Sequence, residues 1–348
     1  MIPTVDISQE TDRHVIIAQG TEDVYQGHPT TLLMPDNKTM FCVWTYDHGG
    51  ACGPLKKSPD GGLTWSELLP VHESWPTVRN CPAIYRLTDP DGTARLVVFA
   101  ISDGEICRSY SEDEGETWSE MKTIGIEAVM PWTTVVAIKG KRYLAQTNAR
   151  CPGDPDRRTN RVVQSISEDG GLTWAKETIA AEMPGCQPCE PAILRSPDGA
   201  QLLCLMRENS RTINSLKMTS DDEGETWSEA TELPDALTGD RHMPRCTPDG
   251  RWVIAFRDMA AESPDRGHFV AWVGTYEDIV EGREGQYRIK LLHNYKGTDC
   301  GYPGVELLPD GTLAATTYVK YREGPVQHSV VSVRFTLDEM DAKVKAMQ

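Results

Sequence analysis

Residues that could transfer protons stand close together in the first part of the sequence. His28 precedes Pro29, and Asp47 and His48 are neighbours about twenty residues later. An imidazole exchanges its proton near neutral pH, which makes it a competent general acid or base. If the fold brings His28 and His48 together, with His242 beside them, the set could hydrolyse a bound substrate or eliminate a group from it. Asp47 and His48 are the proton donors that this segment offers.

Metal binding by these residues is weakly supported. His28, Asp47 and His48 lack the spacing of a metal motif, and Cys186 and Cys189 form a single Cys-x-x-Cys pair. A structural zinc site needs a second such pair or a histidine pair. We therefore expect neither a metal nor another cofactor. The ten cysteines lack the spacing of a disulfide framework, which indicates buried thiols in a reducing compartment.

Composition and charge limit the class of protein and its partners. The 348 residues include 35 Lys and Arg against 52 Asp and Glu, a net charge of −17, and 39% are hydrophobic. These values fit a globular protein that repels nucleic acid and anionic membranes. No stretch approaches the roughly 20 apolar residues of a membrane span. The residues after Met1 have neither the basic start nor the apolar core of a signal peptide, so we expect a cytoplasmic protein.

One motif, Ser-x-Asp-x-Gly-x-Thr-Trp, occurs four times at almost constant spacing. Its four tryptophans are 53, 56 and 53 residues apart: Trp65, Trp118, Trp174 and Trp227. In such a motif the Asp side chain bonds the backbone of a turn, the Gly accepts a positive φ, and the Trp reaches the core. We therefore interpret these aspartates as structural residues and not as catalytic ones.

A second repeat predicts the fold. Six units each begin with a proline that precedes an apolar strand, a Pro-Asp-Gly-like turn in most units, and another apolar strand. Their prolines are 53, 49, 60, 53 and 59 residues apart: Pro29, Pro82, Pro131, Pro191, Pro244 and Pro303. Each unit has room for four short antiparallel strands. We predict an all-β chain, a six-bladed β-propeller over residues 1–348 as one domain, with a short C-terminal helix within 336–348.

The four boxes in a six-unit all-β chain resemble the Asp boxes of the sialidase (neuraminidase) superfamily. This resemblance covers nearly the whole chain and is more specific for the fold than for the reaction. It implies a carbohydrate site at one end of the propeller axis. There, three arginines would clamp a substrate carboxylate, a Glu would activate a Tyr nucleophile, and an Asp of the first blade would act as acid and base.

The resemblance assigns roles to residues of the fourth, fifth and sixth units. Glu190 opens the fourth unit like the family's base, and Arg207 follows 17 residues later like its second arginine. Tyr302 opens the sixth unit like the nucleophile. The third arginine is expected at Arg266, with Arg257 and Arg241 as the competing positions.

The first unit departs from the family pattern. His28 stands where a sialidase has an arginine, and Asp47 or His48 would have to supply the proton. Loss of one charged hydrogen bond would weaken carboxylate binding by about 1–3 kcal/mol. We therefore expect an exo-acting, sialidase-like glycoside hydrolase on an acidic or polar sugar, and not a true sialidase. A histidine-based hydrolase or lyase, and a carbohydrate-binding propeller without turnover, remain the alternatives.

Overall fold

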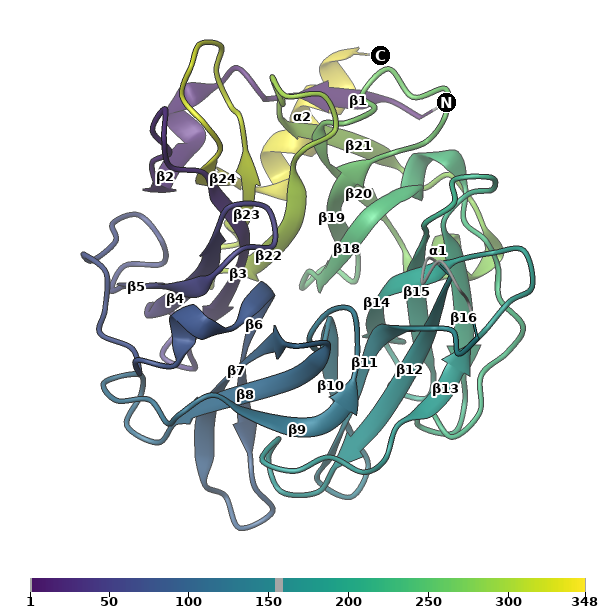
Figure 1. Cartoon of the computed structure of the whole chain (residues 1–348). Coiled ribbons are helices and arrows are strands. Elements are labelled where there is room, and N and C mark those ends of the chain that lie inside the picture. Colours follow the sequence, from purple (N-terminus) through teal and green to yellow (C-terminus); the bar gives the residue numbers. More distant parts are fainter. Residues whose placement is uncertain (1, 154–158, 348) are drawn as a thin grey trace.

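Six β-sheets surround a common axis in the computed structural model, which describes residues 2–153 and 159–347 (Figure 1). In each sheet the first strand of a sequence unit lies innermost, and the following strands lie successively farther out. The blades are numbered in chain order. The first blade contains β3 (Gln26–Leu33), β4 (Met40–Tyr46) and β5 (Cys52–Ser58), and the second contains β6 (Arg79–Thr88), β7 (Ala94–Ser102), β8 (Glu105–Ser111) and β9 (Lys122–Glu127). The third contains β10 (Thr134–Ile138), β11 (Arg142–Arg150), β12 (Asn160–Ser167) and β13 (Thr178–Ala181).

The other three blades use both ends of the chain. The fourth blade contains β14 (Pro188–Arg195), β15 (Leu202–Glu208), β16 (Leu216–Ser220) and β17 (Thr231–Glu232). The fifth contains β18 (Gly239–Cys246), β19 (Trp252–Asp258), β20 (Phe269–Gly274), β21 (Tyr287–Leu292) and β1 (Thr4–Asp6). The sixth contains β22 (Gly301–Leu307), β23 (Leu313–Val319), β24 (Ser329–Phe335) and β2 (His14–Ala18). The predicted all-β, six-bladed propeller is thus confirmed.

The strand count departs from four in two blades. The first blade has three strands in the described part of the chain, and the fifth has five because β1 adds to β21 in parallel. In the sixth blade the outermost strand is β2, which pairs antiparallel with β24, for instance Ile16 with Val331. The ring is therefore closed by strands from opposite ends of the chain, which the repeat pattern did not predict.

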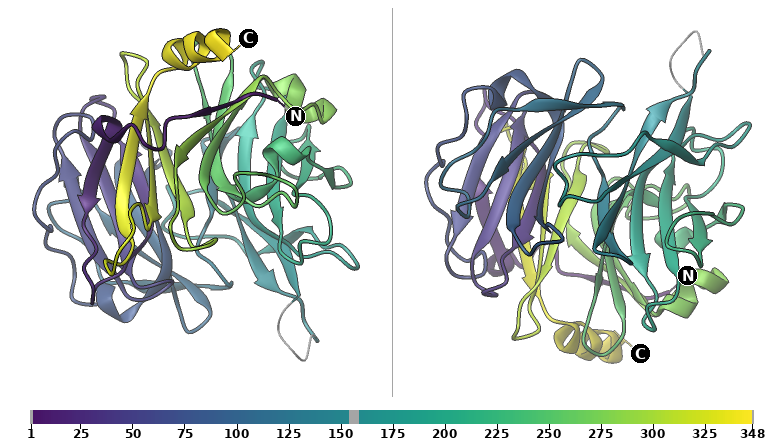
Figure 2. Two further views of the ribbon diagram at one scale, coloured as in Figure 1. Left: turned by 90° about the horizontal axis from the view of Figure 1, so that it is seen from above. Right: turned by 90° about the horizontal axis from the view of Figure 1, so that it is seen from below.

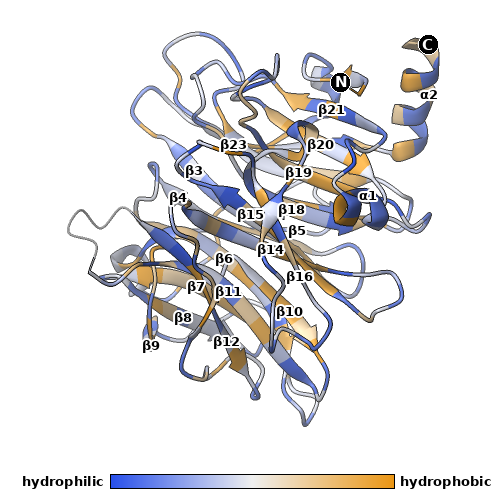
Figure 3. Ribbon diagram, turned by 90° about the vertical axis from the view of Figure 1, so that its right-hand side faces the viewer, coloured by the Kyte–Doolittle hydropathy of each residue, from blue (hydrophilic) through white to orange (hydrophobic). Residues whose placement is uncertain are grey.

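The core consists of separate apolar layers between neighbouring blades. Six clusters of buried side chains fill the six blade-to-blade contacts, among them Phe41 with Val98 between the first two blades and Phe256 with Leu205 between the fourth and fifth. Hydrophobic residues accordingly lie mostly on the strands, and the loops are largely hydrophilic (Figure 3). No blade buries its own faces alone, so burial of apolar area stabilises the ring as a whole.

Each of the four Asp boxes forms the turn after the third strand of its blade. In the third blade the Asp169 carboxylate accepts hydrogen bonds from the Thr173 backbone at 2.8 Å and from its hydroxyl at 2.5 Å. The Gly171 amide donates to the Ser167 hydroxyl at 2.9 Å. The following Trp174 packs on Trp132, with 5.0 Å between ring centroids. The boxes are thus structural turns, as predicted, and Trp174 packs against the apolar layer between the second and third blades.

Two α-helices lie outside the ring. α1 (Tyr276–Glu281) follows β20, and α2 (Leu337–Met347) ends the described chain beside β1 (Figures 1 and 2). Thr336 and Glu339 exchange the hydrogen bonds of a capping box at the start of α2. Three short 3₁₀ helices occupy Thr11–Arg13, Trp75–Thr77 and Asp235–Leu237. Neither α-helix of the described chain is long and apolar enough to cross a lipid bilayer.

Candidate active site

Five inner strands have, as their second or third residue, one that the backbone turns toward the axis. Each of these residues has a positive φ of 26–57°, and each lies where the pairing with the second strand is interrupted: His28, Cys81, Glu190, Arg241 and Tyr302. A positive φ costs a side-chain-bearing residue about 1–3 kcal/mol and persists only where the surroundings enforce it. Such strain in five blades at one end of the axis marks this end as the candidate site.

Tyr302 and Glu190 meet across the axis. The Tyr302 hydroxyl donates a hydrogen bond of 2.5 Å to Oε1 of Glu190, and Arg207 donates one of 2.9 Å to the same oxygen. Glu190 is 3% exposed and Tyr302 9%. Burial, and then the charge of Glu190, raise the pKa of Tyr302 well above its usual value. The phenol therefore stays protonated unless a neighbouring base takes its proton.

Asp240 holds three arginines together beside this pair. Its carboxylate forms ion pairs with Arg257, with Arg211 at 2.8 Å and with Nε of Arg207 at 3.1 Å, the last not aligned for a hydrogen bond. Burial alone would raise the pKa of Asp240, but Arg257, Arg207 and Arg211 outweigh it and hold that pKa well below its ordinary value. Asp240 thus offsets one of the three positive charges, and Glu190, which pairs with Arg207, offsets a second.

His28 and Cys81 lie beside Tyr302. Nδ1 of His28 is 3.1 Å from Sγ of Cys81, whose thiol donates to Oδ1 of Asn80 at 3.0 Å. The His28 ring lies 4.5 Å from the Tyr302 ring. Burial above all, and then the neighbouring His48, lower the pKa of His28 well below its usual value, so its imidazole is neutral. Its buried Nε2 has no hydrogen-bond partner among the described residues, and neither does Oε2 of Glu190.

Asp299 collects the donors at the exposed edge of the site. Its carboxylate lies 3.0 Å from Nδ1 of His48 and accepts hydrogen bonds from Tyr25 at 3.1 Å and from Tyr318 at 3.2 Å. Nε2 of His328 is 3.3 Å away. Burial raises the pKa of Asp299, but its bonds and the nearby histidines lower it to about 2 overall. His48, with its side chain 58% exposed, is oriented by an ionised carboxylate.

The predicted residues are distributed unequally. Tyr302, Glu190, Arg207, Arg257, His28 and His48 come together around the axis. His242 is buried, with Nε2 3.0 Å from the Leu237 carbonyl oxygen and its ring against Phe256. Asp47 is exposed, and its carbonyl accepts a hydrogen bond from Thr45.

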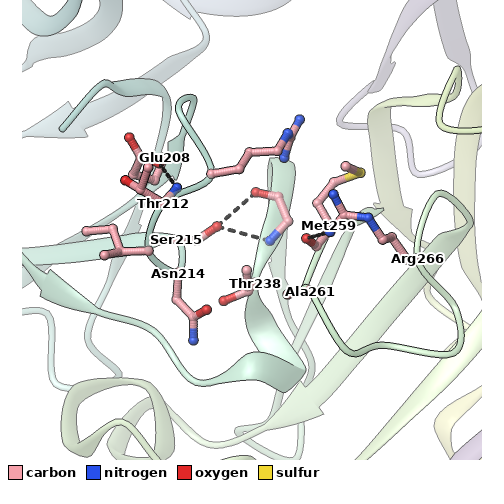
Figure 4. A pocket seen from close by; sticks show the side chains of 11 residues that line it. Glu208, Thr212, Asn214, Ser215, Thr238, Met259, Ala261 and Arg266 are labelled. Carbon is pink, nitrogen blue, oxygen red and sulfur yellow. Dashed lines mark hydrogen bonds between the residues drawn. The ribbon is translucent and has the colours of Figure 1, made fainter.

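Arg266 lies in a separate pocket on the same face. It donates to the carbonyls of Met259 and Ala260 and lines a pocket of about 330 Å³ between the fourth and fifth blades, together with Glu208 and Arg211 (Figure 4). The carboxylate of Glu208 is bonded by the loop that follows it, including Ser210 at 2.7 Å. Arg211 joins this pocket to the axial cluster through Asp240.

Several residues of the cluster were not predicted from the sequence, among them Cys81, Arg211, Asp240 and Asp299. Cys81 stands immediately before a unit proline, as His28, Glu190 and Tyr302 do, so its position was a usable signal. Asp240 lies near the start of β18 and Asp299 just before β22, neither in a motif of its own, and only the folded ring brings them to the arginines and histidines. Among the described residues, no group of three or more His, Cys, Asp or Glu side chains could hold a metal ion.

Comparison with known proteins places this geometry in context. Residues 151–314, somewhat less than half of the chain, match the model of the BNR repeat-like domain family. A comparison with curated proteins finds no match.

Among solved structures, a protein of unknown function from Dyadobacter fermentans has a TM-score of 0.72 at 17% identity, over 92% of this chain and 97% of that one. An α-L-arabinofuranosidase from Fusarium graminearum, solved with an iminosugar inhibitor, has 0.69 at 14%, over 94% and 98%. The NanB sialidase from Streptococcus pneumoniae has 0.64 at 13%, over 94% and 71%. Such low identities establish the fold and leave the reaction open. The chain is thus a six-bladed β-propeller that matches the BNR repeat-like domain over residues 151–314 and shares its fold with a sialidase and an α-L-arabinofuranosidase.

Proposed function

We propose that this protein is an exo-acting glycoside hydrolase in which Tyr302 is the nucleophile and Glu190 its base. The observation that carries the proposal is the 2.5 Å hydrogen bond between two buried side chains from opposite sides of the axis. Inner strands enclose both groups, so the end of a glycan can reach them more readily than its middle. Solved glycosidases, a sialidase and an arabinofuranosidase among them, share the fold.

The proposed reaction balances as two displacements. Glu190 takes the phenol proton while the Tyr302 oxygen bonds to the anomeric carbon and the glycosidic C–O bond breaks. The departing oxygen receives a proton from a general acid, and water then hydrolyses the glycosyl–tyrosine bond in the reverse sense. Arg207 supports the first step, because its hydrogen bond orients the Glu190 carboxylate toward the phenol.

His48 is our choice for the general acid. It is exposed at the edge of the cluster, 4.5 Å from the His28 ring, and Asp299 orients its Nδ1. A carboxylate that fixes an imidazole in this way is a common arrangement for proton transfer. For the Asp47 side chain, the described chain shows no comparable partner.

We propose a neutral sugar, and the anionic substrate expected from the sequence is not retained in this proposal. Asp240 and Glu190 together offset two of the three positive charges of Arg207, Arg211 and Arg257, and Asp240 contacts all three guanidiniums, which reduces their demand for a substrate carboxylate. Three buried atoms near Tyr302 lack a hydrogen-bond partner among the described residues: Oε2 of Glu190, an acceptor; Nε2 of His28, whose role depends on the tautomer; and Nε of Arg207, a donor. The Glu190 acceptor suits the hydroxyl donors of a neutral sugar and repels a carboxylate.

A panel of aryl glycosides tests the proposal. Neutral furanosides and pyranosides, sialosides and uronides are offered to the wild type, Tyr302→Phe, Glu190→Gln and Tyr110→Phe, in which a hydroxyl on the second blade is removed as a control. We expect turnover of a neutral glycoside, a loss of about 10²–10⁴-fold in kcat for Glu190→Gln, and a larger loss for Tyr302→Phe. A slowly hydrolysed fluoroglycoside should leave a sugar mass on the Tyr302 peptide. Unchanged turnover by Tyr302→Phe would refute the nucleophile.

The His48–Asp299 pair favours one second candidate, a histidine-based hydrolase or lyase in which Tyr302 only donates a proton. In that reaction His48→Ala abolishes turnover and Tyr302→Phe merely slows it. The same panel separates the two, because a lyase releases an unsaturated sugar that absorbs ultraviolet light, whereas a hydrolase consumes water.

A further inference from the structure

Arg241 is a buried arginine that differs from the neighbouring arginines in its lack of a carboxylate partner among the described residues. Its side chain is among the largest that are fully buried, and the residue is 2% exposed. It donates a hydrogen bond of 3.1 Å to the Thr133 carbonyl oxygen across the axis. Arg207, Arg211 and Arg257 all reach the Asp240 carboxylate, whereas no described carboxylate lies within ion-pair distance of Arg241.

Arg241 is one of the residues that line a channel along the axis. The channel has a volume of about 380 Å³, and residues of all six inner strands line it. The lining includes Arg241 but none of His28, Cys81, Glu190 and Tyr302. The channel is therefore distinct from the candidate active site and lies farther along the inner strands, with Arg241 between the two.

The channel is positively charged in a strongly acidic protein. Its lining holds Arg86, Arg241 and Arg245 against one carboxylate, Glu306. That carboxylate is already engaged, by Arg245 at 3.0 Å and by the Thr31 hydroxyl at 3.0 Å. Two positive charges thus remain in the lining, while the whole chain carries −17.

The guanidinium of Arg241 cannot become neutral by losing a proton, because arginine stays charged in proteins. An unpaired charge in a protein interior costs several kcal/mol, which a counterion next to it offsets. We propose that the axial channel is an anion site in which Arg241 binds a small monovalent anion of the size of chloride. This site is independent of the proposed hydrolase reaction and uses neither its nucleophile, its base nor its general acid.

Chloride binding is measured in solution with the full chain by the line width of the ³⁵Cl resonance. Unfolding is followed alongside in sodium chloride against sodium gluconate at constant ionic strength. At a chloride concentration ten times the dissociation constant, the unfolding equilibrium constant should fall about elevenfold. Arg241→Met should remove both the added line width and this stabilisation.

Arg108→Met is the matched control. Arg108 also donates to a backbone carbonyl, that of Leu172 at 2.6 Å, and no described carboxylate forms an ion pair with it, but it lies in the second blade outside the channel. It should keep the full chloride response. If gluconate stabilises the wild type as well as chloride does, the channel holds water alone and the proposal is overturned. The proposal is also overturned if the Arg241→Met protein keeps the chloride response. Should Arg241→Met fail to fold, a bromide-soaked crystal of the wild type decides, because anomalous scattering must show bromide at Arg241.

Discussion

Replacing Asp240 by Asn is the most informative perturbation of the axial cluster. Asp240 is 1% exposed and contacts three guanidiniums, so its amide isostere leaves Arg207, Arg211 and Arg257 with Glu190 as the one remaining carboxylate among their described ion pairs. Removal of one partner from a buried ion pair costs about 3–5 kcal/mol. At about 2 °C per kcal/mol for a large domain, Tm should fall by roughly 6–10 °C at neutral pH.

The pH dependence gives this prediction a second, independent readout. The pKa of Asp240 lies below its unfolded value, which is near 3.9 for an aspartate. Its stabilising effect is therefore fully present above that unfolded value and is lost as the pH falls through the folded one. Scanning calorimetry should show a constant Tm difference between wild type and Asp240→Asn above about pH 5 and a shrinking one below about pH 4.

Asp249→Asn serves as the control for this experiment. Asp249 also pairs with an arginine, Arg251 at 2.7 Å, but its side chain is 49% exposed. Exposed pairs contribute about 0–1 kcal/mol, so its Tm should change by no more than about 2 °C. An Asp240→Asn protein within that same range of the wild type would refute the claim that Asp240 is the ionised partner of the arginine cluster, and with it the argument for a neutral sugar.

Three further predictions concern the ring. Asp169→Ala should lower the free energy of unfolding by about 1–3 kcal/mol in chemical denaturation, because the turn of the Asp box loses its hydrogen-bond acceptor. An unchanged free energy of unfolding would mean that the box does not stabilise the fold. Gly171→Ala and Gly199→Ala both place alanine at a positive φ, but Gly171→Ala should lower stability more, since its Cβ would lie 2.4 Å from Leu87, whereas the space at Gly199 is open. Equal losses of stability would contradict packing of the third-blade box against Leu87 of the second blade. Deletion of residues 1–18 should abolish cooperative thermal unfolding by leaving the outer edges of β24 and β21 unpaired, and a truncated protein with the Tm of the full chain would disprove closure of the ring by these strands.

The fold could be predicted because its information is local and repeated. A box such as that around Asp169 fixes its own turn, and six prolines at nearly equal spacing mark six inner strands. The two N-terminal strands escaped prediction because β1 has three residues and each of the two strands finds its partner roughly 300 residues later. No local pattern records such a pairing.

The candidate site could be predicted only where it follows the repeat. Glu190 and Tyr302 stand immediately before their unit prolines, and the structure brings them together. In the fifth blade the interruption of strand pairing aims Arg241 at the axis, three residues before Pro244, so the proline no longer marks the inward residue. Asp240 entered the cluster through that same shift. Its three arginine contacts depend on tertiary structure and have no signal in sequence spacing.

Closure of the sixth blade by β2 also sets an order of events during synthesis. The segment His14–Ala18 leaves the ribosome early, but its partner Ser329–Phe335 is among the last residues made. At 5–20 residues per second, Ile16 waits roughly 16–60 seconds for Val331. During that interval β2, an apolar segment with the sequence His-Val-Ile-Ile-Ala, lacks its partner strand β24, and the ring of blades is not yet closed. The newborn chain must therefore be kept from pairing with other chains until its last strand arrives.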